Sequence, residues 1–319
     1  MKRFILLSSI MILFTTLLSL FLGCVIHRKN ACAIQKNETA IILFDVLGTI
    51  RYNLDFVGDV EDYGALPSYL QEKTDELQTI SNLFILDNTN RILFRSNMKA
   101  LSKEMKEVRS GRSLLLGSAF YTAMPLNDKY RLLAQADGAR LREDLNEQNR
   151  KFAFAALLGS LLTEGSLILI RFFVKSRNRL QFFTGLLVGL WIFLFSAGIG
   201  VVNTNTYMNS LDQLKGKIES SFSLDLLTIF EKGGTPETIS GVETYLERYS
   251  EGFPEISTIE YDPDSGDLII HYNEQYLSRV YIDYILETVL CLALTGMILA
   301  EWRIMLGTEK ENRLSEEPL

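Results

Sequence analysis

The sequence has few of the residues that enzymes and metal sites use most. Its 319 residues include only two histidines, three cysteines and six prolines. His27 and His271 lie far apart in the chain, and no cysteine or histidine spacing matches a zinc site. A glycine-rich phosphate loop and a nucleophile with its base are also missing. We therefore expect no catalytic residue, no metal and no cofactor, and we predict that the protein is not an enzyme.

The three cysteines form no disulfide framework. Cys24 and Cys291 lie in apolar stretches, and Cys32 stands alone between them. The stretch "LFLGC" ending at Cys24 partly resembles a lipoprotein cleavage box, although Phe21 and Leu22 fit that box poorly. Two interpretations stay open, lipidation at Cys24 and an uncleaved signal anchor.

Positive charge is scarce in the second half of the chain. Residues 203–280 carry 5 Lys and Arg against 14 Asp and Glu, whereas residues 28–150 carry 17 of each sign. An acidic surface repels nucleic acid and anionic membrane surfaces. We therefore expect no nucleic-acid partner.

Long apolar runs are abundant. Four of them, 4–26, 152–174, 180–202 and 282–306, are close to the ~20 apolar residues that a helix needs to cross a bilayer. The sequence therefore predicts four transmembrane helices and a membrane lipid environment.

Basic residues set the expected orientation of these helices. The loop 175–179 reads "KSRNR", and Lys2 and Arg3 precede the first run. Short basic loops stay on the cytoplasmic side, so both termini, including the tail 307–319, are expected inside an inner or plasma membrane. The segments 27–151 and 203–281 are then extracytoplasmic, and the fold class is an α+β membrane protein with two outer domains.

A β-hairpin pattern occurs in both outer segments. Residues 80–97 read "ISNLFILDNTNRILFRSN", with turn residues between two apolar runs. Residues 256–273 read "ISTIEYDPDSGDLIIHYN" and align with the first stretch without gaps. The chain therefore looks like a duplicated unit of span, outer domain and span, in which the second domain is shortened.

The order of elements in residues 38–150 is a long helix, a short helix, about five strands and an exit helix. With the "LFILDNTNRILFRSN" hairpin after an amphipathic helix, this order resembles the Cache-type, PAS-like sensor domains of bacterial membrane receptors. The resemblance implies an extracytoplasmic sensor with an α/β fold. It carries no invariant motif, and the aromatic and arginine signature of amino-acid-binding Cache domains is absent.

Strand alternation indicates a candidate ligand pocket in the first outer domain. Leu93 and Arg95 are expected on one sheet face, and Ile92 and Phe94 on the other. Four side chains could hold a small anionic ligand, because guanidinium groups match carboxylate geometry: Arg95, Tyr121, Tyr130 and Arg131. The alternative is a solvated sheet edge with core tyrosines.

Two features of the spans are candidates for a function within the membrane. Glu164 lies near the middle of the second run, where a carboxylate is costly, and is expected either to hydrogen-bond a neighbouring helix or to relay protons. Gly185 and Gly189 form a GxxxG pattern that permits close helix packing, within the chain or in a homodimer.

The cytoplasmic segments are too short for a kinase, cyclase or phosphatase. We therefore expect a transmembrane sensor or receptor subunit without its own output domain, which relays the binding of a ligand or partner to a separate signalling protein. A related interpretation is that the chain is the sensory half of a longer signalling enzyme. The alternative is a structural or transport-associated subunit resembling the four-span permeases of ABC systems.

Overall fold

The computed structural model describes residues 2–77, 79–97, 105, 107–174, 176–231, 246, 255–262 and 267–315. The chain divides into two compact units. We call Met1–Arg28, Asn146–Thr206 and Ser278–Leu319 the helical unit, and Lys29–Leu145 with Tyr207–Leu277 the sheet unit.

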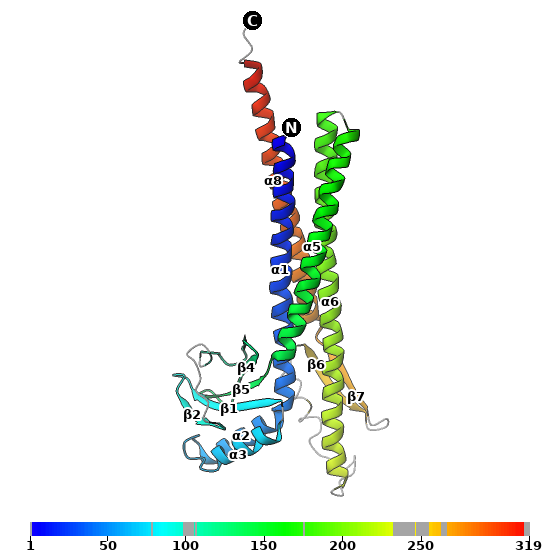
Figure 1. Ribbon diagram of the computed structural model, residues 1–319. Coiled ribbons are helices and arrows are strands. Elements are labelled where there is room, and N and C mark those ends of the chain that lie inside the picture. The colour runs from blue at the N-terminus through cyan, green and yellow to red at the C-terminus, as the bar shows by residue number, and fades with distance from the viewer. Residues whose placement is uncertain are drawn as a thin grey trace. The chain divides into compact units, whose positions relative to one another are not determined.

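Four long helices carry the apolar runs: α1 (Lys2–Ile42), α5 (Ala139–Phe173), α6 (Arg177–Glu231) and α8 (Glu274–Ser315) (Figure 1). Each contains a stretch that is long and apolar enough to cross a membrane, namely Ser9–Ile42, Ala139–Phe173, Phe182–Ser220 and Glu274–Met297. The prediction of four apolar helices compatible with a membrane is therefore confirmed.

The helices extend beyond the apolar runs. The hydropathy pattern places the end of the third run at Val202, but α6 continues to Glu231 without a break. Residues 203–231 contain no proline and one glycine, so nothing in this stretch ends the helix. A predicted span and a predicted outer helix are thus one element.

A five-stranded antiparallel sheet forms the centre of the first segment. Its strands are β1 (Ile80–Asp87), β2 (Ile92–Arg95), β3 (Ser113–Leu116), β4 (Ala119–Pro125) and β5 (Tyr130–Asp137), in the order β2-β1-β5-β4-β3. The predicted hairpin is confirmed, because Phe84 pairs with Arg95 and Ile85 with Phe94. Its turn places Asn90 at a φ of 67°, a left-handed conformation that asparagine tolerates.

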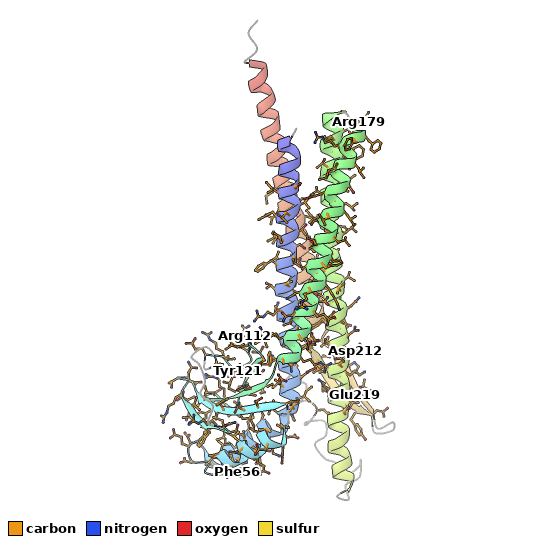
Figure 2. The ribbon with its side chains drawn as sticks, viewed as in Figure 1. Phe56, Arg112, Tyr121, Arg179, Asp212 and Glu219 are labelled. Atoms are coloured by element: carbon orange, nitrogen blue, oxygen red, sulfur yellow. The ribbon has the colours of Figure 1, made fainter. Side chains whose placement is uncertain are left out.

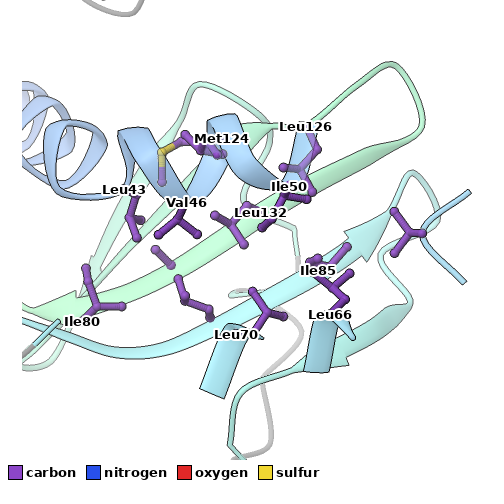
Figure 3. Close-up of a cluster of buried hydrophobic side chains, with 14 of the residues drawn as sticks. Leu43, Val46, Ile50, Leu66, Leu70, Ile80, Ile85, Met124, Leu126 and Leu132 are labelled. Carbon is purple, nitrogen blue, oxygen red and sulfur yellow. The ribbon is translucent and has the colours of Figure 1, made fainter. Parts of the chain in front are cut away.

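Two helices cover one face of this sheet. They are α2 (Phe44–Val57) and α3 (Leu66–Glu76), whose apolar side chains pack with those of β1, β4 and β5 (Figure 3). Leu43, Ile50, Leu66, Leu70 and Leu132 are fully buried there. This helix-covered face is the main core of the sheet unit.

The opposite face carries a second, smaller core. It contains Phe84, Leu86, Tyr121, Ala123 and Leu133, with Val108 packed against them. Because this cluster shares no residue with the helix-covered core, the sheet is buried on both faces.

Strand alternation fails in β2. Leu93 and Phe94 both pack against the helix-covered core, although they were expected on opposite faces. The cause is an irregularity in the pairing: Ile85 pairs with Phe94 and Leu86 with Ile92, so Leu93 is an extra residue on β2.

The second hairpin is also present. It consists of β6 (Ile256–Asp262) and β7 (Asp267–Tyr272), paired antiparallel. The Tyr272 hydroxyl donates a hydrogen bond to the Leu211 carbonyl of α6 at 3.3 Å. This hairpin and the first sheet belong to the same compact unit.

Candidate functional site

The four residues predicted to line one pocket occupy different places in the sheet unit. Tyr121 and Arg131 belong to the face of the smaller core, since they pair with Leu114 and Leu86, two residues of that core. Tyr130 packs against the helix-covered core. Arg95 lies at the end of the edge strand β2. Figure 2 shows Tyr121 within the sheet.

Tyr130 is fixed by a hydrogen bond across the sheet unit. Its hydroxyl donates to Asp59 Oδ1 at 2.7 Å. This bond raises the pKa of Tyr130 to about 12 and holds the pKa of the Asp59 carboxyl below its usual value. Tyr130 therefore links β5 to the segment after α2.

Arg131 is held within the domain. Its side chain is 7% exposed, and it donates through Nη1 to the Asp87 carbonyl at 2.9 Å and through Nη2 to Asn90 Oδ1. Burial lowers the pKa of this guanidinium. Both contacts pin the turn between β1 and β2, so an anion bound at Arg131 would compete with them.

Arg95 lines an open groove between α3 and β2. The other lining residues come from α3 and include Glu72, Asp75 and Glu76, and the groove volume is about 720 Å³. Three carboxylates beside one guanidinium make this groove acidic. Its charge disfavours the small anion that was expected at Arg95.

A row of buried polar side chains crosses the face of the smaller core. Asn82 of β1 lies opposite Gln135 of β5, and Gln135 lies opposite Tyr121 of β4. The three side chains are 2%, 4% and 1% exposed, respectively. Asn82 Nδ2 donates to Gln135 Oε1 at 3.0 Å, while Asn82 Oδ1 is buried and has no hydrogen-bond partner among the described residues.

This polar row has hydrogen-bonding capacity that the described residues leave unused. Asn82 Oδ1 can accept one, and the Tyr121 hydroxyl can donate or accept. Arg131 lies four residues from Gln135 on the same strand, roughly 14 Å away at the usual rise of a β-strand, so the row and Arg131 do not converge. The sequence carries a signal for this row, because Asn82 and Gln135 are polar residues within apolar strands. Asn82 and Gln135 are not among the predicted site residues, because those are charged or aromatic side chains.

The polar row lies close to the point where strand β5 passes into helix α5. Gly138 alone separates β5 from α5, and its N–H donates to the Ser118 carbonyl at 2.9 Å. A Cβ at Gly138 would stand 3.2 Å from the backbone nitrogen of Phe120 and 2.8 Å from Leu115 Cδ1. The strand and the helix therefore meet in tight packing.

Replacing Gly138 with alanine should loosen this junction. The added Cβ would press on the backbone nitrogen and the Cβ of Phe120, so we expect a destabilisation of about 1–2 kcal/mol. It should be seen as faster hydrogen exchange in β5 and in the first turn of α5 of the full chain. Gly48→Ala in α2 is the matched control, because its Cβ would meet nothing within 4 Å. Equal exchange in both variants would contradict the tight junction.

In the helical unit, the predicted polar residue is not the most deeply buried one. Glu164 is half-buried and has no hydrogen-bond or ion-pair partner among the described residues. Its hydrogen bond to a neighbouring helix therefore stays a prediction. Glu287 on α8, which the hydropathy pattern does not single out, is 4% exposed.

A close helix approach involves a glycine outside the GxxxG pair. Gly185 and Gly189 are half-buried, and a Cβ at Gly189 would meet nothing within 4 Å. In contrast, a Cβ at Gly159 of α5 would lie 1.7 Å from the Trp191 ring of α6. The Trp191 Nε1 donates to Thr16 Oγ1 of α1 at 3.1 Å, so this ring joins three helices.

No protein-family model, curated protein or solved structure matches the chain.

Proposed function

We propose that the chain is a transmembrane sensor or receptor subunit. In this proposal the sheet unit lies outside an inner or plasma membrane, both termini are cytoplasmic, and the binding of a ligand or partner is relayed to a separate signalling protein. The four apolar helices and the mixed helix and sheet composition of the chain support it.

One observation carries the proposal. The central strand β5 passes through the single residue Gly138 into α5, which is continuous from Ala139 to Phe173. A rigid helix transmits a displacement of its first turn along its length, whereas a flexible linker would absorb it. A change in the sheet near Gln135 would therefore reach the apolar part of the same helix.

The connection on the entry side supports the same mechanism. The long helix α1 ends at Ile42, and α2 begins at Phe44 and packs on the sheet through Val46, Ile50 and Leu54. The order of α1, α2, α3, five strands and α5 follows the order expected for Cache-type sensor domains. We therefore retain this family as part of the proposal.

The polar row of Asn82, Gln135 and Tyr121 is the candidate binding site in this proposal. The ligand expected there is a small polar molecule that donates a hydrogen bond to Asn82 Oδ1. The alternative is the anionic ligand that the sequence predicts at Arg95, Tyr121, Tyr130 and Arg131. Variants distinguish these two kinds of ligand. Asn82→Ala should weaken the first kind of binding, and Arg95→Ala or Arg131→Ala the second.

The experiment uses the full chain in lipid nanodiscs with spin labels on α5 and α6 near Phe173 and Phe182. A panel of amino acids, polyamines, carboxylates and sugars is screened by thermal shift, and each hit is then tested for a change in the distance between the labels. We expect at least one hit to stabilise the chain and to change this distance.

A Gly-Gly-Ser insertion after Gly138 is the control. It should keep the thermal shift and abolish the distance change, because the flexible insert no longer transmits the displacement. A hit that changes the distance equally with the insertion would contradict relay through this junction. A full screen without any hit would contradict a small-molecule sensor.

Co-purification separates the proposal from the transport-associated alternative. A signalling enzyme bound to the chain would support the receptor, and a transport ATPase would support the permease-like subunit.

A further inference from the structure

A buried carboxylate lies where three helices of the helical unit meet. Glu287 of α8 is 4% exposed, and Ser19 of α1 and Ser196 of α6 are each 0% exposed. The Ser19 Oγ lies 3.2 Å from Glu287 Oε1 and 2.8 Å from Ser196 Oγ. These three side chains form one hydrogen-bonded chain across α1, α6 and α8.

The donors in these two hydrogen bonds are fixed, because each serine hydroxyl has one proton to donate. Ser19 donates its one hydroxyl proton to Glu287 Oε1, so Ser196 must donate its own proton to Ser19. Both hydroxyl groups then point their protons towards the carboxyl group. Glu287 Oε2 is also buried and has no hydrogen-bond partner among the described residues.

No described cation compensates a charge on Glu287, since all of its contacts are with neutral or weakly acidic groups. The thiol of Cys24 on α1 and the thiol of Cys291 on α8 are the titratable groups that interact with it. Two further carboxyl groups lie on helices of the same unit, Asp283 one turn earlier on α8 and Glu164 in the apolar part of α5, and neither can supply a positive charge. An ionised carboxylate here would be uncompensated, and inside a bilayer that is costly.

Two species could neutralise the site, a proton or a metal cation. A hard cation needs several oxygen ligands spread around it at about 2.3 Å or more. Ser19 and Ser196 are bonded directly to each other, and Glu287 presents a single further oxygen to them. This arrangement favours the proton.

We propose that Glu287, with Ser19 and Ser196, is a proton-binding site within the helix bundle, occupied at neutral pH. Loss of the proton would leave a charge at the contact of α1, α6 and α8 and would loosen their packing. Because the same contact is close-packed, with a Cβ at Gly23 only 2.5 Å from Ile199 Cγ2, a shift of one helix must move its neighbours. This inference does not depend on the proposed sensor function.

The test uses the full chain in lipid nanodiscs and dicyclohexylcarbodiimide, an apolar reagent that adds to protonated carboxyl groups. Labelling is located by mass spectrometry between pH 5 and pH 10. We expect Glu287 to be labelled at pH 7 and to lose labelling as the pH rises. Glu287→Gln should remain folded by gel filtration and lose this label, since glutamine has the shape of the protonated form.

The Ser19→Ala variant tests the hydrogen-bonded chain. Ser19 donates to the carboxyl group and so stabilises its charged form, and without it Glu287 should keep its proton to a higher pH. We expect half-labelling to move up by about one pH unit, a tenfold change in proton affinity. Ser166→Ala is the control, because Ser166 Oγ donates a hydrogen bond to the Leu162 carbonyl of its own helix at 2.8 Å and has no other hydrogen-bond partner among the described residues.

Three results would overturn the proposal. The first is that Glu287 is not labelled at pH 5 to 7 although the chain is folded. The second is that sodium or potassium chloride suppresses the labelling at constant ionic strength. The third is that Ser19→Ala leaves the pH dependence of labelling unchanged. The second would identify a cation site in place of the proton.

Discussion

Replacing Gly159 with alanine should prevent α5 from packing against α6. The added Cβ would lie 1.7, 2.2 and 2.6 Å from three carbons of the Trp191 ring, so the ring must leave its position. Moving it also breaks the hydrogen bond from Trp191 Nε1 to Thr16 Oγ1. We expect a loss of about 3 kcal/mol, the upper part of the range for overpacked sites.

Gly165→Ala is the matched control on the same helix. A Cβ at Gly165 meets nothing within 4 Å, so this variant should be as stable as the parent chain. Stability is measured as the fraction of full chain that stays monodisperse in detergent over a temperature series. Adding Trp191→Leu to Gly159→Ala should recover part of the loss, since contacting residues do not act additively. Equal behaviour of the two glycine variants would contradict the close approach.

Raising the pH should destabilise the sheet unit through Glu255. This carboxyl group is 1% exposed, and the Asn37 amide donates to its Oε2 at 2.6 Å. Burial raises its pKa, although the contacts with Asn37, Lys36 and Tyr276 oppose the shift. The folded chain therefore binds this proton more tightly than the unfolded chain does.

The sign of the effect follows from this difference. A raised pKa in the folded state contributes stability that is fully present below the unfolded value, about 4.3, and is lost as the pH rises through the folded value. The Glu255→Gln variant has no such proton and keeps an oxygen for the Asn37 amide. It should therefore be more stable than the parent chain above the folded pKa, by about 1.4 kcal/mol for each unit by which folding raises this pKa.

Thermal unfolding of the full chain between pH 4 and pH 9 measures this effect. The parent chain should lose stability as the pH increases, and the variant should lose less. Glu260→Gln is the control, because Glu260 is exposed on β6 and its carboxylate has one ionic partner among the described residues, His271 at 3.8 Å. Parallel curves for the parent chain and Glu255→Gln would contradict a buried, protonated carboxyl group.

The sequence predicts the elements of this protein better than their contacts. Hydropathy locates the four apolar helices, and the turn residues 87–90 locate the first hairpin, because both signals are local. Hydropathy does not locate the end of α6 at Glu231, because a change from apolar to polar residues ends an apolar run without ending a helix. The register shift beside Leu86 is not predictable in this way, because it depends on pairing between strands.

The polar site in the helical unit shows the same limit. Glu164 and Glu287 both lie in apolar runs, and composition does not say which of them faces the neighbouring helices.

The short outer strands of the five-stranded sheet limit how copies of the chain can associate. β2 and β3 form its two edges, and each has four residues. Proteins avoid uncontrolled pairing between sheets by keeping edge strands short or irregular, and β2 also lies beside the register shift. A second copy added to either edge would gain a ladder of a few hydrogen bonds at most. We therefore expect any homodimer of this chain to be held together by its helices, and the sheet to resist growth into β-aggregates.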